Sequence, residues 1–343
     1  MTTFKEIRGT AIESVSSDPS NPEVGQIWYN NTIGVLKGYQ VSAGTFASGG
    51  NLVTAVFGQG GAGTQTAALN FGGSGGNGPV TNVTQSYNGT SWSPVNSMGT
   101  ARSDLAGIGT QTAALGFGGY ITGNPAPTKT SVLTESWNGT SWSPVGNLNT
   151  ARYGPGGCGT QTAGLAFGGG GQGPTFPRLN STESWNGTSW TNVPATLSAA
   201  RVAFGSAGTQ TAALGFGGYV SGPPIFSNAT EEYDGSTWTA GNNLNTARGG
   251  MGGFGTQTAA VGAGGYSALG GVITTATELY DGTTWTSNPT GLATARKGQT
   301  GSVGTQSLGL VAGGYTFPPA GTATNITEEW NGPTLVVKKI TTS

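Results

Sequence analysis

The side chains in this chain that could do electrostatic chemistry form two regular series. An arginine begins each of five successive segments, and a glutamate follows it 30 to 33 residues later: Arg102, Arg152, Arg201, Arg248 and Arg296, with Glu135, Glu183, Glu231, Glu278 and Glu328. The segment before them has Val56 and Gln85 instead, so both partners are lost together. Removing one partner of a buried ion pair costs about 3–5 kcal/mol. This joint loss predicts that each arginine binds the glutamate of its own segment; a ring of arginines for an anionic ligand is the alternative.

Catalytic and metal-binding side chains are scarce. The chain has no histidine, the commonest general base and metal ligand. Its one cysteine, Cys158, supports neither a disulfide nor a thiolate metal site within the chain, and we interpret it as a small buried hydrophobe. Acids are almost absent from the strands expected to be innermost, with Asp104 as the exception. We therefore predict a protein that is not an enzyme and has no metal site and no cofactor.

A repeat must position the charged series. The motif Gly-Thr-Gln-Thr/Ser begins at Gly63, Gly109, Gly159, Gly208, Gly255 and Gly304. A double glycine follows nine residues later in each case, and both series advance by 46, 50, 49, 47 and 49 residues. With 65 glycines and 8% charged residues, the composition alone would suggest a low-complexity chain. A period of this length with strand-like units instead indicates a propeller or a solenoid.

Each repeat contains four strand-like runs. In the second repeat they are residues 102–108, a run that ends at the double glycine, a run that ends at Trp137, and a run through Trp142. Asn-Gly or Asp-Gly recurs at 88, 138, 186, 234, 281 and 331, which predicts a type I′ hairpin turn rather than a glycosylation site. Small residues in the first run and aromatic residues in the last two fit wedge-shaped units that pack around an axis.

These features together resemble the kelch repeat. The shared features are the double glycine after a hydrophobic strand, Glu-x-Tyr/Trp about fifteen residues later, a tryptophan after five more, and then the arginine; they cover residues 54–338. The resemblance implies an all-β, six-bladed kelch-type β-propeller with four antiparallel strands per blade, over residues 45–343, with repeats that start near 54, 101, 151, 200, 247 and 295. The last repeat has Leu335 in place of the fourth-strand tryptophan, which would mark the seam of the ring.

Residues 1–44 lie outside the repeats. We interpret residues 14–23 as an extended linker and residues 25–39 as a hairpin around Asn30 and Asn31. The stretch 25–32 resembles N-terminal modules of bacteriophage tail-fibre and other virion proteins, especially those of marine phages. A lone hairpin is too small to be stable and would expose Ile27, Trp28 and Tyr29. We expect these residues to attach the chain to another virion protein, or else to pack on the propeller as an edge strand.

Variation between repeats is confined to one face. The spacing from the second glycine to the third-strand aromatic residue is 14, 18, 16, 15, 15 and 16, whereas both hairpin turns at the other end hardly change. Loops on a rigid scaffold often carry binding residues, so we predict a binding face there. Solvated connectors are the alternative. The candidate residues are Tyr120, Pro125, Pro127, Phe176, Arg178, Tyr219, Phe226, Tyr266, Tyr315 and Phe317.

Two functions remain from different classes. The first is a structural or adhesive virion protein of a bacteriophage, such as a tail-fibre component, whose partners are other virion proteins and a host-surface glycan. The second is a cellular kelch-type protein–protein interaction module, although such adaptors usually carry a helical domain that this sequence does not suggest. A net charge of -1 argues against nucleic acid as a partner, and no apolar run has the length of a signal peptide or a membrane span. The first function therefore predicts assembly into virions in the host cytoplasm.

Overall fold

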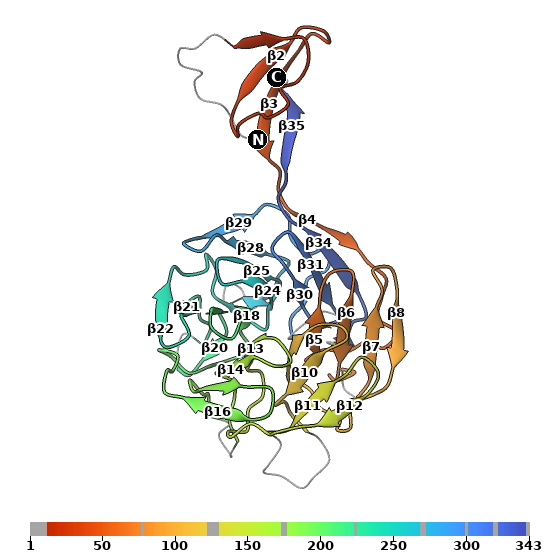
Figure 1. Cartoon of the computed structure of the whole chain (residues 1–343), viewed down its shortest axis with the longest axis vertical. Helices are drawn as coiled ribbons and strands as arrows, with labels where there is room; N and C mark the ends of the chain where they lie inside the picture. The colour runs from red at the N-terminus through yellow and green to blue at the C-terminus, as the bar shows by residue number, and fades with distance from the viewer. Residues whose placement is uncertain are drawn as a thin grey trace. The chain divides into compact units, whose positions relative to one another are not determined.

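The computed structural model describes residues 12–76, 79–121, 130–172, 177–222, 225–267, 272–298, 301–317 and 322–340. The chain divides into two compact units. The smaller unit contains residues 1–44 together with 333–343, and the larger unit contains residues 45–332 (Figure 1). Each unit is described by itself below.

The larger unit contains six four-stranded antiparallel sheets, here called blades one to six. Blade one is β5 (Gly60–Gly63), β6 (Ala68–Phe71), β7 (Thr84–Tyr87) and β8 (Trp92–Val95); blade two is β9 (Ala106–Gly109), β10 (Ala114–Phe117), β11 (Thr134–Trp137) and β12 (Trp142–Pro144); blade three is β13 (Gly156–Gly159), β14 (Gly164–Phe167), β15 (Thr182–Trp185) and β16 (Trp190–Val193). Blade four is β18 (Gly205–Gly208), β19 (Ala213–Phe216), β21 (Thr230–Tyr233) and β22 (Trp238–Gly241); blade five is β24 (Gly252–Thr256), β25 (Ala259–Ala263), β28 (Thr277–Tyr280) and β29 (Trp285–Asn288); blade six is β30 (Val303–Gly304), β31 (Leu308–Ala312), β34 (Thr327–Asn331) and β4 (Thr45–Ser48).

The blades form a closed ring. Each innermost strand lies against the innermost strand of the next blade, and β30 of blade six lies against β5 of blade one (Figure 1). Short additional strands pair with one another at the loop ends of blades four to six. They are β17 (Arg201–Val202) with β20 (Tyr219–Val220), β23 (Arg248–Gly249) with β26 (Tyr266–Ser267) and β27 (Val272–Ile273), and β32 (Tyr315–Thr316) with β33 (Thr322–Ala323). The fold is an all-β six-bladed propeller, and within the described ranges it contains no helix. Accordingly, those ranges hold no helix that could span a membrane.

The last blade obtains its outer strand from the other end of the chain. Strand β4 pairs with β34, and the rings of Phe46 and Trp330 lie 4.9 Å apart at the position that a fourth-strand tryptophan occupies elsewhere. Our placement of Leu335 in that strand was wrong, because β35 (Leu335–Lys339) belongs to the smaller unit. Pro333 directly follows Asn331-Gly332 and has no N–H for the turn, so the chain leaves the blade there.

The other five hairpin turns also differ from our expectation. Each contains four residues rather than two, as the pairing of Tyr87 with Trp92 across residues 88–91 illustrates. Of the Asn-Gly pair only the glycine has a positive φ, and Gly89 has a φ of 89°. The Asn88 side-chain oxygen instead accepts hydrogen bonds from the N–H groups of Thr90 and Ser91, both at 2.9 Å. Because a carboxylate oxygen accepts the same bonds, this geometry explains why aspartate replaces asparagine in two repeats.

The double glycines let neighbouring blades approach closely. In blade two, Gly118 and Gly119 both have positive φ, at 68° and 102°. A Cβ on Gly118 would lie 2.6 Å from the carbonyl oxygen of Arg152 in blade three. The N–H of Gly119 donates to that same oxygen at 2.8 Å. A side chain at position 118 would therefore push the next blade away, and one at position 119 would collide with Ser103 and Leu105 of its own blade.

The smaller unit is one four-stranded sheet in the order β1-β2-β3-β35. Strands β2 (Ile27–Asn30) and β3 (Val35–Val41) form the expected hairpin. Strand β1 (Glu13–Val15), whose last two residues we expected to begin a linker, pairs parallel with β2, and the C-terminal strand β35 pairs antiparallel with β3. Residues from both ends of the chain therefore complete the hairpin and give it a stable sheet.

Candidate functional site

The five ion pairs predicted from the sequence are present. Every arginine side chain is 0% exposed and contacts the glutamate of its own blade. The distance is 2.7 Å for Arg152–Glu183 and 3.0 Å for Arg102–Glu135, Arg248–Glu278 and Arg296–Glu328, and Arg201 pairs with Glu231. Burial lowers the pKa of Arg102 to about 10, and the charge of Glu135 opposes that shift. No guanidinium group of these five is available to a ligand.

The glutamates also fix the segment that enters each blade. Glu183 accepts hydrogen bonds from the N–H groups of Asn149 at 2.7 Å and Thr150 at 3.1 Å. In blade one, Gln85 accepts the equivalent bonds from Val53 at 2.7 Å and Thr54 at 3.1 Å, while Val56 is fully buried. Blade one therefore keeps the hydrogen bonds to the entering backbone, although Val56 and Gln85 replace the charged arginine and glutamate.

A closed ring of backbone hydrogen bonds joins the six blades beside these pairs. It involves the second residue after each arginine or its counterpart: Gly58, Asp104, Gly154, Ala203, Gly250 and Gly298. Each N–H donates to the carbonyl oxygen of the preceding blade over 2.5 to 2.9 Å, and Gly58 donates to Gly298 at 2.7 Å across the seam. All six residues have positive φ, including the non-glycine residues Asp104 at 51° and Ala203 at 52°. Sequence reasoning missed this ring, although glycine at four of the six positions was a visible signal.

The glutamine of the repeated Gly-Thr-Gln motif was also missed as a structural residue. Its side chain reaches the preceding blade, where Gln161 donates to the carbonyl oxygen of Trp137 at 2.5 Å and to the Ser136 hydroxyl at 2.9 Å. Gln65 makes the corresponding bond to Trp330 at 2.7 Å and so joins blade one to blade six. Its occurrence in every repeat was the signal that could have revealed this function.

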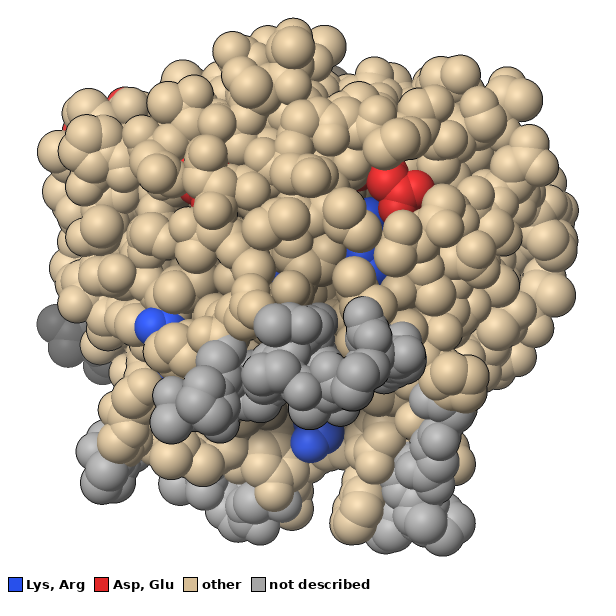
Figure 2. All heavy atoms as spheres, turned by 90° about the horizontal axis from the view of Figure 1, so that it is seen from below, with Lys and Arg blue, Asp and Glu red and all other residues tan. Residues whose placement is uncertain are grey.

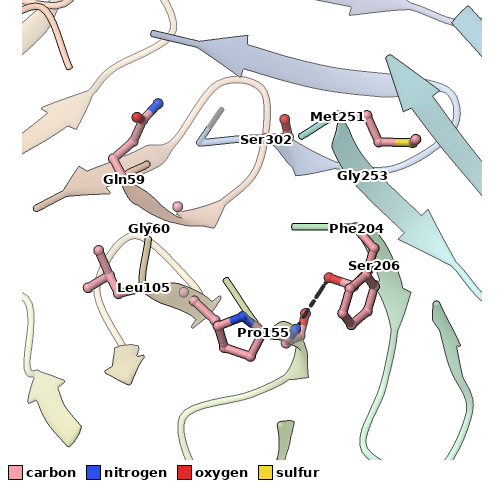
Figure 3. A pocket seen from close by; sticks show the side chains of 13 residues that line it. Gln59, Gly60, Leu105, Pro155, Phe204, Ser206, Met251, Gly253 and Ser302 are labelled. Carbon is pink, nitrogen blue, oxygen red and sulfur yellow. Dashed lines mark hydrogen bonds between the residues drawn. The ribbon is translucent and has the colours of Figure 1, made fainter. Parts of the chain in front are cut away.

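The central channel is narrow. Figure 3 shows side chains from several blades, among them Gln59, Leu105, Pro155, Phe204 and Met251, around one cavity of this channel. The two cavities along the channel measure about 80 and 110 Å³. Pockets that bind small molecules usually measure about 300–1,000 Å³. The channel, as lined by the described residues, is therefore too small to enclose such a ligand.

The described ranges contain no group of three or more Cys, Asp or Glu side chains that could hold a metal ion. Cys158 is buried, as we interpreted it, and burial raises the pKa of its thiol well above the usual range.

Most acidic side chains of the propeller already have partners, since five of them bind arginines. Glu232 and Glu329 accept hydrogen bonds from the hydroxyls of Tyr280 and Tyr87, and Asp234 and Asp281 bind turn N–H groups.

Asp104 is the one ionisable residue of the backbone ring. Burial raises the pKa of its carboxyl group to about 6, and a 3.2 Å hydrogen bond from the Ser103 hydroxyl opposes the shift. Burial also raises the pKa of nearby Tyr153, and the negative charge of Asp104 adds to that shift. Asp104 is therefore held in an uncommon backbone conformation and in an environment that disfavours its charged form.

Replacing Asp104 by asparagine is expected to stabilise the protein in a pH-dependent way. The pKa of Asp104 is higher in the folded state, so its ionisation reduces stability as the pH rises from about 4 to 6. Asparagine tolerates positive φ and carries no charge. The variant should gain at most about 3 kcal/mol at pH 8 and almost nothing at pH 4. Urea denaturation at both pH values measures this, and an equal gain at both would contradict the assignment.

The candidate residues of the loop face separate into two groups. Tyr219, Phe226, Tyr266 and Tyr315 belong to one continuous arc of contacts, whereas Tyr120 and Arg178 lie elsewhere on the face. Tyr120 contacts Tyr153 at 6.4 Å between ring centroids, and Arg178 donates to the Ser221 hydroxyl at 3.1 Å. Phe317 is 64% exposed. Pro125, Pro127 and Phe176 lie outside the described residues.

The arc runs from blade four through blades five and six to blade one. Ring centroids lie 5.1 Å apart for Tyr219–Phe226, 5.5 Å for Phe226–Tyr266 and 5.3 Å for Tyr315–Phe57. Lys297 connects the two halves, with its Nζ atom 4.5 Å from the Tyr266 ring centroid and 5.6 Å from that of Tyr315. Phe226 is buried and the other aromatic side chains are half-buried. We call Tyr219, Phe226, Tyr266, Lys297, Tyr315 and Phe57 the aromatic arc.

The attachment residues of the smaller unit are arranged differently from our expectation. Trp28 is 0% exposed, and its indole N–H donates to the Asp18 carboxylate at 3.1 Å. Asn30 and Lys37 also donate to that carboxylate, at 2.9 and 2.6 Å. The hydrogen bond from Lys37, followed by those from Asn30 and Trp28, lowers the pKa of Asp18 to about 2. Trp28 therefore stabilises the sheet and has no exposed surface, contrary to our expectation.

The other two attachment residues remain accessible. Tyr29 is 40% exposed, and Ile27 is half-buried beside a groove of about 480 Å³. The groove lies entirely within the smaller unit, and Tyr39, Val41 and Ile340 also line it. The smaller unit thus has apolar surface that a partner could cover, even though Trp28 is buried.

Comparison with known proteins supports the fold. No protein-family description matches this chain, and no curated protein sequence does so. Among solved structures, the one titled "Structure of YjhT" is similar, with a TM-score of 0.68 and 12% sequence identity. The match covers 83% of this chain and 99% of that chain. At this identity the similarity concerns the fold alone, and it agrees with a propeller.

Proposed function

We propose that this protein is a non-enzymatic structural and adhesive virion protein of a bacteriophage. In this proposal the smaller unit attaches the chain to another virion protein, and the loop face of the propeller binds a host-surface glycan or protein. The aromatic arc is the observation that carries the proposal. It places half-exposed tyrosines on a rigid ring, and aromatic side chains bind with little loss of conformational freedom.

Other features support separate parts of this proposal. The resemblance of residues 25–32 to virion modules supports a place in the particle, as does the accessible apolar surface around Tyr29 and Ile27. Most acidic side chains of the propeller already make structural contacts, and this supports a binding function rather than a catalytic one. The regular series of double glycines and Arg–Glu pairs supports a kelch-type assignment of the blades.

A pair of exposed apolar residues tests the binding face. Phe317 lies two residues after Tyr315 of the aromatic arc, on the loop face of blade six. Leu308 lies after the hairpin turn at the opposite end of the same blade and is 49% exposed. Replacing Phe317 by serine should weaken binding of the purified protein to host cells about tenfold, because an interface aromatic residue typically contributes more than 1 kcal/mol. Replacing Leu308 by serine should leave binding unchanged. Equal effects of the two changes, or no binding by the wild type, would contradict the proposal.

A further inference from the structure

The aromatic arc contains a single cation, and its surroundings leave that cation without a carboxylate. No carboxylate oxygen of the described residues lies within 4.0 Å of Lys297 Nζ, although all five buried arginines and Lys37 have such a partner. Burial lowers the pKa of Lys297, so its charged form is incompletely stabilised by its present contacts. The lysine therefore retains the capacity to bind an anion.

The residues beside Lys297 are suited to a ring-shaped ligand. The ring centroids of Tyr266 and Tyr315 lie 4.5 and 5.6 Å from the ammonium group, and each ring has an apolar face and a polar hydroxyl. Phe57 extends this surface beyond Tyr315. A sugar ring that lies on a tyrosine face could place a charged substituent against the ammonium group.

Few described cations of the propeller lack a carboxylate partner. Figure 2 shows one side of the molecule, where Lys, Arg, Asp and Glu atoms occupy only small areas among the residues that are coloured by type. Arg178 is the other propeller cation without a carboxylate partner among the described residues, and its Nη1 atom already donates to Ser221. Lys297 is therefore the cation of the arc that an anion would meet.

We propose that Lys297, Tyr266 and Tyr315 form a subsite for a saccharide that carries an anionic group, either a carboxylate or a phosphate. The inference rests on the proposed glycan-binding function and names the ligand class of the same face. Tyr266 and Tyr315 hold the sugar ring, and Lys297 donates hydrogen bonds to the anion. This arrangement makes the charge on Lys297 the source of discrimination between anionic and neutral sugars.

The test compares three probes on the full-length protein: a galacturonic acid trimer, galactose 6-phosphate and a neutral galactose trimer. We expect wild-type protein to bind at least one anionic probe about tenfold more tightly than the neutral one, a preference worth about 1.4 kcal/mol. The preference should shrink as salt is raised, because the charge is partly exposed. Which anionic probe is preferred distinguishes the carboxylate from the phosphate.

Lys297→Met should abolish the preference and leave affinity for the neutral trimer unchanged. Methionine has a similar length and makes favourable contacts with aromatic rings, so the variant should fold, which near-ultraviolet circular dichroism checks. Lys338→Met removes an exposed lysine of the smaller unit and is the matched control, for which we expect no change.

Three results overturn the inference, and they differ in what they say of the proposed function. If wild-type protein binds the neutral trimer as tightly as the anionic probes, or if Lys297→Met keeps the preference, the subsite is wrong while glycan binding stands. If wild-type protein binds none of the probes and does not bind host cells, both proposals fail.

Discussion

Replacing Arg152 by valine should destabilise the protein by about 3–5 kcal/mol. The change leaves the carboxylate of Glu183, which is 0% exposed, without its cation. Adding Glu183→Gln should recover more than half of that loss, because the double variant reproduces the uncharged pair Val56 and Gln85 of blade one. Glutamine can still accept the hydrogen bonds that Glu183 now receives from Asn149 and Thr150.

Urea denaturation followed by tryptophan fluorescence measures these differences, since the transition midpoint shifts with stability. Lys339→Val, which removes an exposed charge of the smaller unit, is the control and should shift the midpoint by less than about 0.5 kcal/mol. A double variant that is no more stable than Arg152→Val alone would show that the two side chains do not act as a pair.

Removing β4 should have the second large effect. A chain that begins at residue 41 keeps β4 and should form the complete propeller, although β35 loses its partner strand β3. A chain that begins at residue 49 lacks β4, so the N–H and carbonyl groups along one edge of β34 lose their partners and Trp330 loses its contact with Phe46. We expect this second chain to lose more than about 3 kcal/mol of stability, or not to fold.

Two further variants separate the causes. Phe46→Ser keeps the strand but removes the ring, and it should fall between the two truncations in thermal stability. Removing residues 333–343 from the chain that begins at residue 41 should not reduce its stability, because those residues belong to the smaller unit. Equal stability of the two N-terminal truncations would contradict the closure of the ring by β4.

The repeat was sufficient to predict the fold because its signals are local. The six double glycines and the Asn-Gly or Asp-Gly turns each follow from backbone conformation within a few residues. The Arg–Glu pairs could also be predicted, because the joint change to Val56 and Gln85 acts as a comparison within one chain. No element of the expected four-strand unit had to be abandoned in blades one to five.

The strand pairings at the two ends of the chain could not be predicted in the same way. The partners β4 and β34 are separated by the whole propeller, and β3 and β35 are separated even further. The run Leu335–Lys339 is compatible with either sheet, and only the proline at 333 indicates that the chain leaves the blade. Trp28 was expected to be exposed because its covering contact with Asp18 comes from a stretch that looked like a linker.

The candidate site was predicted only in part. The tyrosines after the double glycines were correctly placed at one end of the blades, but their contacts with the next blade depend on how far the blades diverge. The sequence did not indicate a function for Lys297, because only one repeat has a lysine at this position. The other repeats have Phe57, Ser103, Tyr153, Val202 and Gly249 there. Its importance depends on the nearby rings of Tyr266 and Tyr315, which come from two different blades.

The most direct test of the central claim is the protein content of purified virus particles. Mass spectrometry should detect the full-length chain in particles made in the presence of the wild-type protein. The chain that begins at residue 41, once shown to fold, should be absent from those particles because it lacks most of the attachment unit. Absence of the wild-type chain from the particles, or normal incorporation of the truncated chain, would contradict the account.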